Sequence, residues 1–164
     1  PTRFADLVAL NALYRPGPMD FIDGYIKRKR GLEAITYDHP IMEKYLKETY
    51  GVIIYQEQLM LLSQEIANFT PEESDLLARA VCCQRLTQQE TALKEQFIRG
   101  GIEIGYADEC LEKIWRDWMR CGNYLFNKSH AVCYTWLAYK MAYLKAHYPE
   151  VFMHAYFTVN DNAI

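Results

Sequence analysis

Four consecutive polar side chains in the last third of the sequence could together bind an anion. They are an amide, an ammonium, a hydroxyl and an imidazole: Asn127, Lys128, Ser129 and His130. The apolar, aromatic run that follows, Ala131 to Tyr148, is typical of a long helix. Asn127 or Ser129 is a suitable N-cap, so the next backbone N–H groups would point out of the helix start beside the lysine. The stretch therefore predicts a phosphate site.

His130 and Tyr134 stand one helical turn apart, so they would lie on one face of this helix. An imidazole and a phenol would then flank whatever is attached to the phosphate. The alternative is a capped helix start with a lysine nearby and no ligand, which is common. His130 and Cys133 also form an H-x-x-C pair, but no second cysteine pair supports it, so no metal site is predicted.

Cations near the N-terminus form a second candidate contact surface. Arg15 precedes Pro16-Gly17-Pro18, which must end the first helix, so it lies at the lip of a rigid corner. It could face a phosphate or carboxylate, or be a surface cation at a helix C-terminus. A second helix at about 20–30 ends in four cations, which could touch a nucleic-acid backbone or only complement the helix dipole. These are Lys27, Arg28, Lys29 and Arg30.

The elements that must position these residues are helices, because apolar residues recur with helical spacing along nearly the whole sequence. An all-α, irregular multi-helix domain is expected, with at most a short extended segment at the apolar run 52–55. Residues 70–73 combine a capping box with a proline at the first helical position, so a helix begins there. Residues 87–90 repeat the capping box, and Gly100-Gly101 is expected to break the helix that follows at about Arg99.

A helix at about 108–120 carries apolar residues and two tryptophans at helical spacing. They are Leu111, Ile114, Trp115 and Trp118. Such residues are more often buried in a core than exposed as a platform for stacking bases, so a core role is predicted.

Length and charge limit the possible functions. The chain has 164 residues, which fits one domain, and starts at Pro1, as expected of a piece of a longer polypeptide. Its net charge of -3 argues against tight binding of duplex DNA by this segment alone. Five cysteines in no zinc-like spacing predict reduced thiols, and no signal peptide or membrane span is recognised, so a soluble, cytoplasmic protein is expected.

Several blocks of the sequence resemble the fingers region of the C family of bacterial replicative DNA polymerases, the DNA polymerase III alpha subunits. The blocks follow one another in the same order as in that family. They are ALYRPGPM (Ala12 to Met19), ETYGVIIYQEQLM (Glu48 to Met60), FTPEESDLLARA (Phe69 to Ala80), FNKSH (Phe126 to His130) and YLKAHYP (Tyr143 to Pro149). Ordered blocks are more specific than one short motif. The resemblance implies a single fingers-domain fragment over 1–164, with N-terminal helices and a connection toward the palm in 1–36 and the main helical body in 37–158.

The resemblance also implies a role: closing over the incoming deoxynucleoside triphosphate (dNTP) and the templating base. Lys128 would neutralise phosphate, with Asn127 and Ser129 donating to it or capping the helix beneath it. His130 could donate to a phosphate, and Tyr134 could pack on the sugar or base. Arg79 would approach from the neighbouring helix. The polar start of the helix at 56–68 could contact a base or the palm, but an ordinary exposed first turn is the prediction for Gln56, Glu57 and Gln58.

Catalysis is expected elsewhere. Phosphoryl transfer needs clustered carboxylates to hold two metal ions, and the acidic residues here are scattered, with no Asp-x-Asp. In the family these aspartates lie in the palm, upstream of this segment. The fragment is therefore expected to hold no catalytic residue, no metal and no cofactor, and to be inactive alone, with Mg²⁺ in the palm of the parent enzyme. Implied partners are primer-template DNA, dNTP, the rest of the polymerase chain and replisome subunits, but no membrane.

Two departures from the family pattern leave an alternative open. Where the family typically has LLRRAMGKK, residues 76–84 retain Arg79 but lack the other arginine, the glycine and both lysines. Leu125 stands where the family usually has a glycine. The chain could therefore be a diverged, non-catalytic DNA-binding or protein-interaction module that keeps the fingers fold. A third hypothesis is a helical structural domain with incidental motifs.

Overall fold

The structure is a computed structural model that describes residues 1–83 and 87–161, and over these residues it is helical with no strand. The α-helices are α1 (Phe4–Leu13), α2 (Phe21–Lys29), α3 (Glu43–Leu46), α4 (Gln56–Ala67), α5 (Pro71–Cys83), α6 (Thr87–Ile104), α7 (Asp108–Cys121), α8 (Lys128–His147) and α9 (Pro149–Asp161). Four 3₁₀ turns, η1 (Pro18–Asp20), η2 (Pro40–Met42), η3 (Lys47–Thr49) and η4 (Gly122–Tyr124), lie in the connections. The all-α prediction is confirmed.

Two hydrophobic cores hold the helices together. The larger core joins α3, α4, α5, α6 and α7, and Trp118 is among its most buried side chains. The predicted core role of the α7 residues is confirmed, because Leu111, Ile114, Trp115 and Trp118 all belong to this cluster. The smaller core takes residues from α1, α2, the segment 54–55 and the first turn of α8.

The predicted extended segment at 52–55 connects these parts. It forms no strand, but Tyr55 makes an isolated parallel bridge with Phe126. The N–H of Gln56 donates to the carbonyl of Phe126 at 3.0 Å, and the N–H of Phe126 donates to the carbonyl of Ile54 at 2.9 Å. The residues just before α8 are thereby held against the start of α4.

The helix start predicted at 70–73 is confirmed. The N–H of Thr70 donates to Glu73 Oε2 at 2.8 Å, and the N–H of Glu73 donates to Thr70 Oγ1 at 3.2 Å. This reciprocal pair satisfies two backbone donors at the start of α5.

The predicted break at Gly100-Gly101 is wrong, because α6 continues through both glycines to Ile104. A side chain at position 100 would collide with the backbone carbonyl of Ala67, and one at 101 with the side chain of Leu111. The two glycines therefore allow α6 to approach α4 and α7 closely. The helix ends only at Gly105, which has a φ of 107°.

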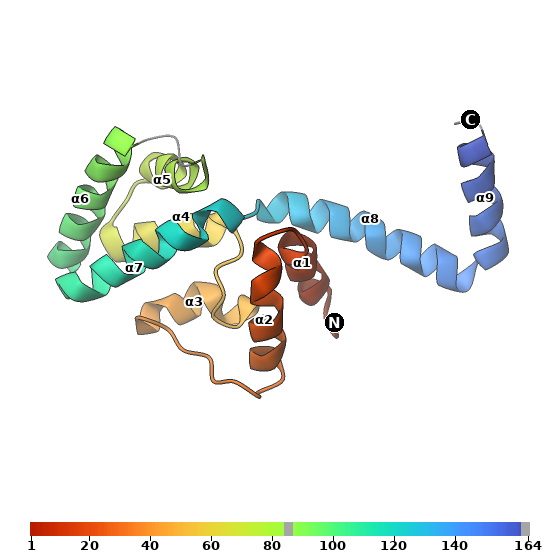
Figure 1. Cartoon of the computed structure of the whole chain (residues 1–164), viewed down its shortest axis with the longest axis horizontal. Helices are drawn as coiled ribbons and strands as arrows, with labels where there is room; N and C mark the ends of the chain where they lie inside the picture. The colour runs from red at the N-terminus through yellow and green to blue at the C-terminus, as the bar shows by residue number, and fades with distance from the viewer. Residues whose placement is uncertain (84–86, 162–164) are drawn as a thin grey trace.

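Helices α8 and α9 project from the rest of the molecule (Figure 1). The first turns of α8 pack on α1, where Ala131 and Thr135 are buried, while most later residues are exposed. Within the described parts of the chain, none of the helices has the length and hydropathy to cross a lipid bilayer.

Candidate functional site

Asn127 is the N-cap of α8. Of the two residues predicted as possible N-caps, Asn127 and Ser129, the first is therefore confirmed. Its Oδ1 accepts the backbone N–H of His130 at 2.9 Å and the hydroxyl of Ser129 at 2.6 Å. The amide and the hydroxyl of the FNKSH stretch are therefore paired with each other at the helix start. Both side chains remain at the surface.

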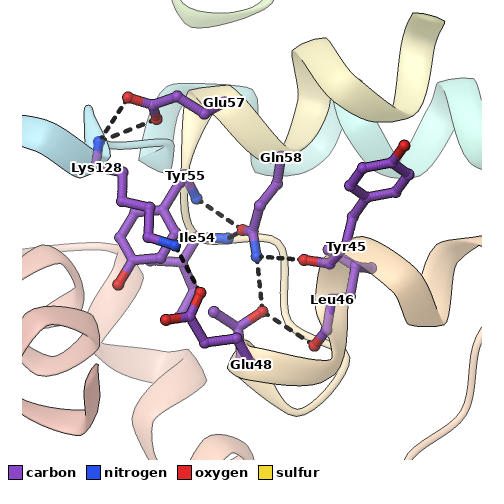
Figure 2. Close-up of polar contacts among 9 residues, drawn as sticks. Tyr45, Leu46, Glu48, Ile54, Tyr55, Glu57, Gln58 and Lys128 are labelled. Carbon is purple, nitrogen blue, oxygen red and sulfur yellow. Dashed lines mark hydrogen bonds and ion pairs between the residues drawn. The ribbon is translucent and has the colours of Figure 1, made fainter. Parts of the chain in front are cut away.

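A carboxylate of the protein itself lies at the helix start where a phosphate was predicted. Both oxygens of Glu57, in the first turn of α4, accept the backbone N–H of Lys128 at 3.0 Å (Figure 2). A negative charge at this end of α8 is stabilised by the helix dipole. A phosphate that used the same N–H would have to displace Glu57 or share the donor with it.

The Lys128 side chain is also engaged within the protein. Its Nζ lies 2.6 Å from Glu48 Oε2 and 5.4 Å from the centre of the Tyr55 ring (Figure 2). Burial, and then the charges of Glu48 and Glu57, raise the pKa of the Tyr55 phenol. The Lys128 side chain is 38% exposed, so it is partly accessible to solvent.

Gln58 is buried at the centre of a polar network, so the predicted exposed first turn is wrong for this residue. Only 6% of it is exposed. Its Oε1 accepts the N–H groups of Ile54 at 2.8 Å and Tyr55 at 3.0 Å, and its Nε2 donates to Thr49 Oγ1 at 2.8 Å and the Tyr45 carbonyl at 3.2 Å (Figure 2). The amide thus fixes the segment that bridges to Phe126.

Arg15 braces the end of α1 against the segment before α8. Its Nε donates to the carbonyl of Ala12 and its terminal nitrogen to the carbonyl of Tyr124, both at 2.8 Å. Its guanidinium carbon lies 4.6 Å from the centre of the Phe126 ring. At this corner the guanidinium therefore donates to two main-chain carbonyls and lies beside an aromatic ring.

Rings continue from Arg15 along the surface of α8. The centroids of Phe126 and His130 lie 5.3 Å apart, and those of His130 and Tyr134 lie 4.5 Å apart. The prediction that His130 and Tyr134 share a face is confirmed. Tyr134 is 58% exposed, so the outer end of this row presents an aromatic ring to solvent.

Most of the other predicted cations pair with carboxylates of the protein itself. Lys27 pairs with Asp23 at 2.6 Å, Arg28 with Glu33 at 2.8 Å, and Lys29 with the buried Asp6; Arg30 is exposed. Arg79 pairs with Asp75 one turn earlier on α5, at 2.5 Å. None of the described hydrogen bonds and ion pairs joins these cations to residues 127–134. The site at the start of α8 is thus assembled from the first turns of α4 and α8, the residues just before each, and Glu48 in η3, with Arg15 beside Phe126.

The residues that depart from the family pattern are largely buried. Leu125 and Ala78 both belong to the larger core. Cys82 accepts a hydrogen bond from Gln56 Nε2 at 3.4 Å. Gln84, the last residue of the altered stretch, lies outside the described residues.

Sequence reasoning missed the roles of Glu48, Glu57 and Gln58 in this site. Their signal was their place in the block 48–60, one of the blocks that carry the family resemblance. The polarity of Gln58 alone could not show burial, since its partners lie in a turn and an extended segment. Across residues 1–83 and 87–161, no group of three or more His, Cys, Asp and Glu side chains is arranged to hold a metal ion.

Comparison with known proteins agrees with the sequence resemblance. The sequence-family model of the bacterial DNA polymerase III alpha subunit finger domain matches residues 1–105. The DNA polymerase III subunit alpha of Halalkalibacterium halodurans is 52% identical over 93% of this chain, and those of Aquifex aeolicus and Borreliella burgdorferi are 46% and 45% identical over 99% of it. The chain spans 14% of the length of each relative. The chain therefore belongs to the bacterial DNA polymerase III alpha subunit family and carries its finger domain.

Proposed function

We propose that this segment binds and positions the incoming dNTP and the template strand in a bacterial replicative DNA polymerase. The observation that carries the proposal is the start of α8, where the partly exposed Lys128 ammonium and the row of rings ending at Tyr134 lie on one short stretch. A cation suits the phosphates of a nucleotide, and an exposed ring suits its sugar or base. Membership of the polymerase family supports this ligand over other anions.

Each side chain has a stated role in this proposal. Lys128 attracts the triphosphate, exchanging its ion pair with Glu48 for a phosphate. His130 donates to a phosphate oxygen, and Tyr134 packs on the sugar or base. Asn127 and Ser129 hold the helix start in place, since they are already bonded to each other. Arg79, exposed on α5, approaches from the side and exchanges Asp75 for phosphate or DNA.

The chemical step belongs to the rest of the polymerase. The described residues offer no carboxylate cluster that fits Mg²⁺, so no step of phosphoryl transfer is assigned to them. In this proposal the full-length protein is a DNA-directed DNA polymerase of the cytoplasm whose palm supplies the metal-binding aspartates. Primer-template DNA and other replication proteins are its partners, and the cations from Arg15 and Lys27 to Arg30 contribute at most peripheral contacts to DNA.

Primer extension by the full-length protein tests the proposal. The Lys128→Ala variant is expected to raise KM for dNTP by roughly 10- to 150-fold with little change in kcat, because a charge-assisted hydrogen bond contributes about 1.5–3 kcal/mol. Lys94→Ala is the matched control: Lys94 lies on α6 and pairs with Glu112 at 2.8 Å, so its loss should leave KM unchanged. An unchanged KM in Lys128→Ala contradicts the proposal.

A second candidate function is a diverged module that keeps the fold without catalysis. The stretch 78–84 favours it, because Ala78, which stands where the family has an arginine, is buried rather than facing a ligand. Primer extension separates the two functions. A folded full-length protein that does not extend a primer would favour the second.

A further inference from the structure

Beyond its first turns, α8 has the apolar side chains of a buried helix, but most of them are not covered by the described residues. Trp136 is 50% exposed, Leu137 58% and Tyr139 49%. The exposed apolar residues fall on two sides of the helix, since positions 136, 139 and 143 follow one helical row and 137, 141 and 144 another. A helix that is apolar on more than one side belongs in the interior of a larger protein.

One of these sides is hollowed into a groove. A cavity of about 440 Å³ lies between the N-terminal residues and α8, lined by Pro1, Phe4 and Leu7 on one wall and by Trp136 and Tyr139 on the other. The ring of Phe4 meets those of Trp136 and Tyr139 edge to face, at 5.8 and 6.2 Å. The inner wall of the cavity is therefore built by α1.

A second cavity continues the first toward the C-terminal end of α8. It has a volume of about 300 Å³ and shares Trp136 and Tyr139 with the first, adding Tyr143 and Leu144. The two hollows adjoin at Trp136 and Tyr139, and we call them together the groove; Pro1 lines its first part. From position 136 to 144 the groove follows α8 for about 12 Å, which is the length of about eight helical or four extended residues.

We infer that, in the full-length subunit, polypeptide joined to Pro1 lies in this groove and covers that side of α8. Pro1 itself lines the groove, so the residues that precede Pro1 can enter the groove directly. The relatives are much longer than the matched segment, which spans 14% of them, so a subunit of their length contains polypeptide outside this segment.

The chemistry of the groove selects the kind of segment. Its walls are aromatic and aliphatic, with Lys140 and Arg3 at the edges, and the Lys140 ammonium already lies 5.2 Å from the centre of the Trp136 ring. Aliphatic or aromatic side chains on the incoming segment would bury apolar area there, at about 25 cal/mol per Å². DNA would find too little positive charge to neutralise its phosphates. This inference does not depend on nucleotide binding at the start of α8.

Photo-crosslinking in the full-length subunit tests the inference. Benzoylphenylalanine replaces Tyr139, which lines both cavities, or, in a second variant, Tyr143, in case the first variant does not fold. Crosslinked peptides are then identified by mass spectrometry. Both positions are expected to crosslink within the same chain to the residues that immediately precede Pro1.

Tyr14 is the matched control, because it is 74% exposed and follows the far end of α1. Benzoylphenylalanine there should not reach the same peptide. Three results would overturn the inference: crosslinks from Tyr139 and Tyr143 to a second copy or another subunit, crosslinks to a different part of the chain, or no crosslink from either position. The same peptide captured from Tyr14 would also overturn it.

Discussion

Two tryptophans in neighbouring helices of the chain have opposite surroundings. Trp118 in α7 is 1% exposed, whereas Trp136 in α8 is 50% exposed. We call residues 1–135 the body and residues 136–161 the arm. In the body, most of the large apolar side chains are buried among elements of the same segment; in the arm, most of them are exposed. The difference shows that the segment is complete as a packed unit only up to the first turns of α8.

The sequences of the two helices contain the reason for this difference. α7 alternates its tryptophans with charged residues such as Arg116, Asp117 and Arg120, so it has one apolar side and one polar side. From 131 to 144, α8 has Lys140 as its only charged residue. A helix such as α7 can lie at the surface of a domain with its apolar side buried. A helix such as α8 needs neighbouring elements on several sides to bury its apolar residues.

The largest expected effect is in the body. Trp118→Ala should lower the free energy of unfolding of the segment 1–164 by about 3–5 kcal/mol, because removal of the large ring leaves a cavity. The centroids of the Trp118 and Phe97 rings lie 4.9 Å apart. Denaturant titration measures the loss of stability. Trp118→Phe is the control: it keeps a ring and removes Nε1, which has no hydrogen-bond partner among the described residues. A loss of less than about 1 kcal/mol in Trp118→Ala would contradict the description of the body as well packed.

A polar substitution in the body should come next. Gln58→Leu is expected to cost about 2–4 kcal/mol, because the backbone N–H groups of Ile54 and Tyr55 would be buried without an acceptor. Gln56→Leu, two positions earlier, removes the side-chain hydrogen bond to Cys82 Sγ at 3.4 Å and should cost less than about 1 kcal/mol. The same denaturant titration measures both variants. If the two variants lost equal amounts of unfolding free energy, the hydrogen bonds of Gln58 would not be the more important ones.

A charged pair in the smaller core should have a smaller, pH-dependent effect. Burial alone would raise the pKa of Asp6, but hydrogen bonds from Lys29 and from the N–H groups of Thr2 and Arg3 outweigh it and hold the pKa well below its ordinary value. A carboxyl whose pKa is lower in the folded state adds stability above its unfolded pKa of about 4, and this stability is lost as pH falls through the folded value.

The Asp6→Asn variant should therefore be less stable than the unchanged chain by about 2 kcal/mol at pH 7, and the gap should narrow below about pH 4. Unfolding titrations from pH 7 to pH 2 measure both quantities. Asp23→Asn, which removes the exposed partner of Lys27, should be indistinguishable from the unchanged chain. A gap in Asp6→Asn that widened as pH fell would contradict the sign of the pKa shift.

Local sequence signals predicted much of the body. The capping box at 70–73, the cap at Asn127 and the core role of the α7 tryptophans each depend on residues within one or two helical turns. The extended run 52–55 was also predicted, because its apolar residues are continuous. Such features need no knowledge of the rest of the fold.

Features that depend on distant partners could not be predicted in the same way. Glu57 and Lys128 are 71 positions apart, and their contact exists only because the bridge from Tyr55 to Phe126 joins the starts of α4 and α8. Gly100 and Gly101 carry the signal of a helix break, yet their lack of side chains allows close packing instead. In each case the long-range contact decides which of two local interpretations holds.

The smallest expected effect is in the arm, and it should depend on how much of the protein is present. Trp136→Ala in the segment 1–164 should cost no more than about 1 kcal/mol, because half of the ring already faces water and its contacts are with Phe4, Tyr139 and Lys140.

In the full-length subunit, if the groove along α8 is filled, the same substitution should cost about 3 kcal/mol or more, approaching the effect of Trp118→Ala, since a buried ring would then be lost. Thermal or denaturant unfolding of both proteins gives the comparison. A cost that stays near 1 kcal/mol in the full-length subunit would mean that this side of α8 stays open to solvent, and that the arm differs from the body in the whole protein as well as in this segment.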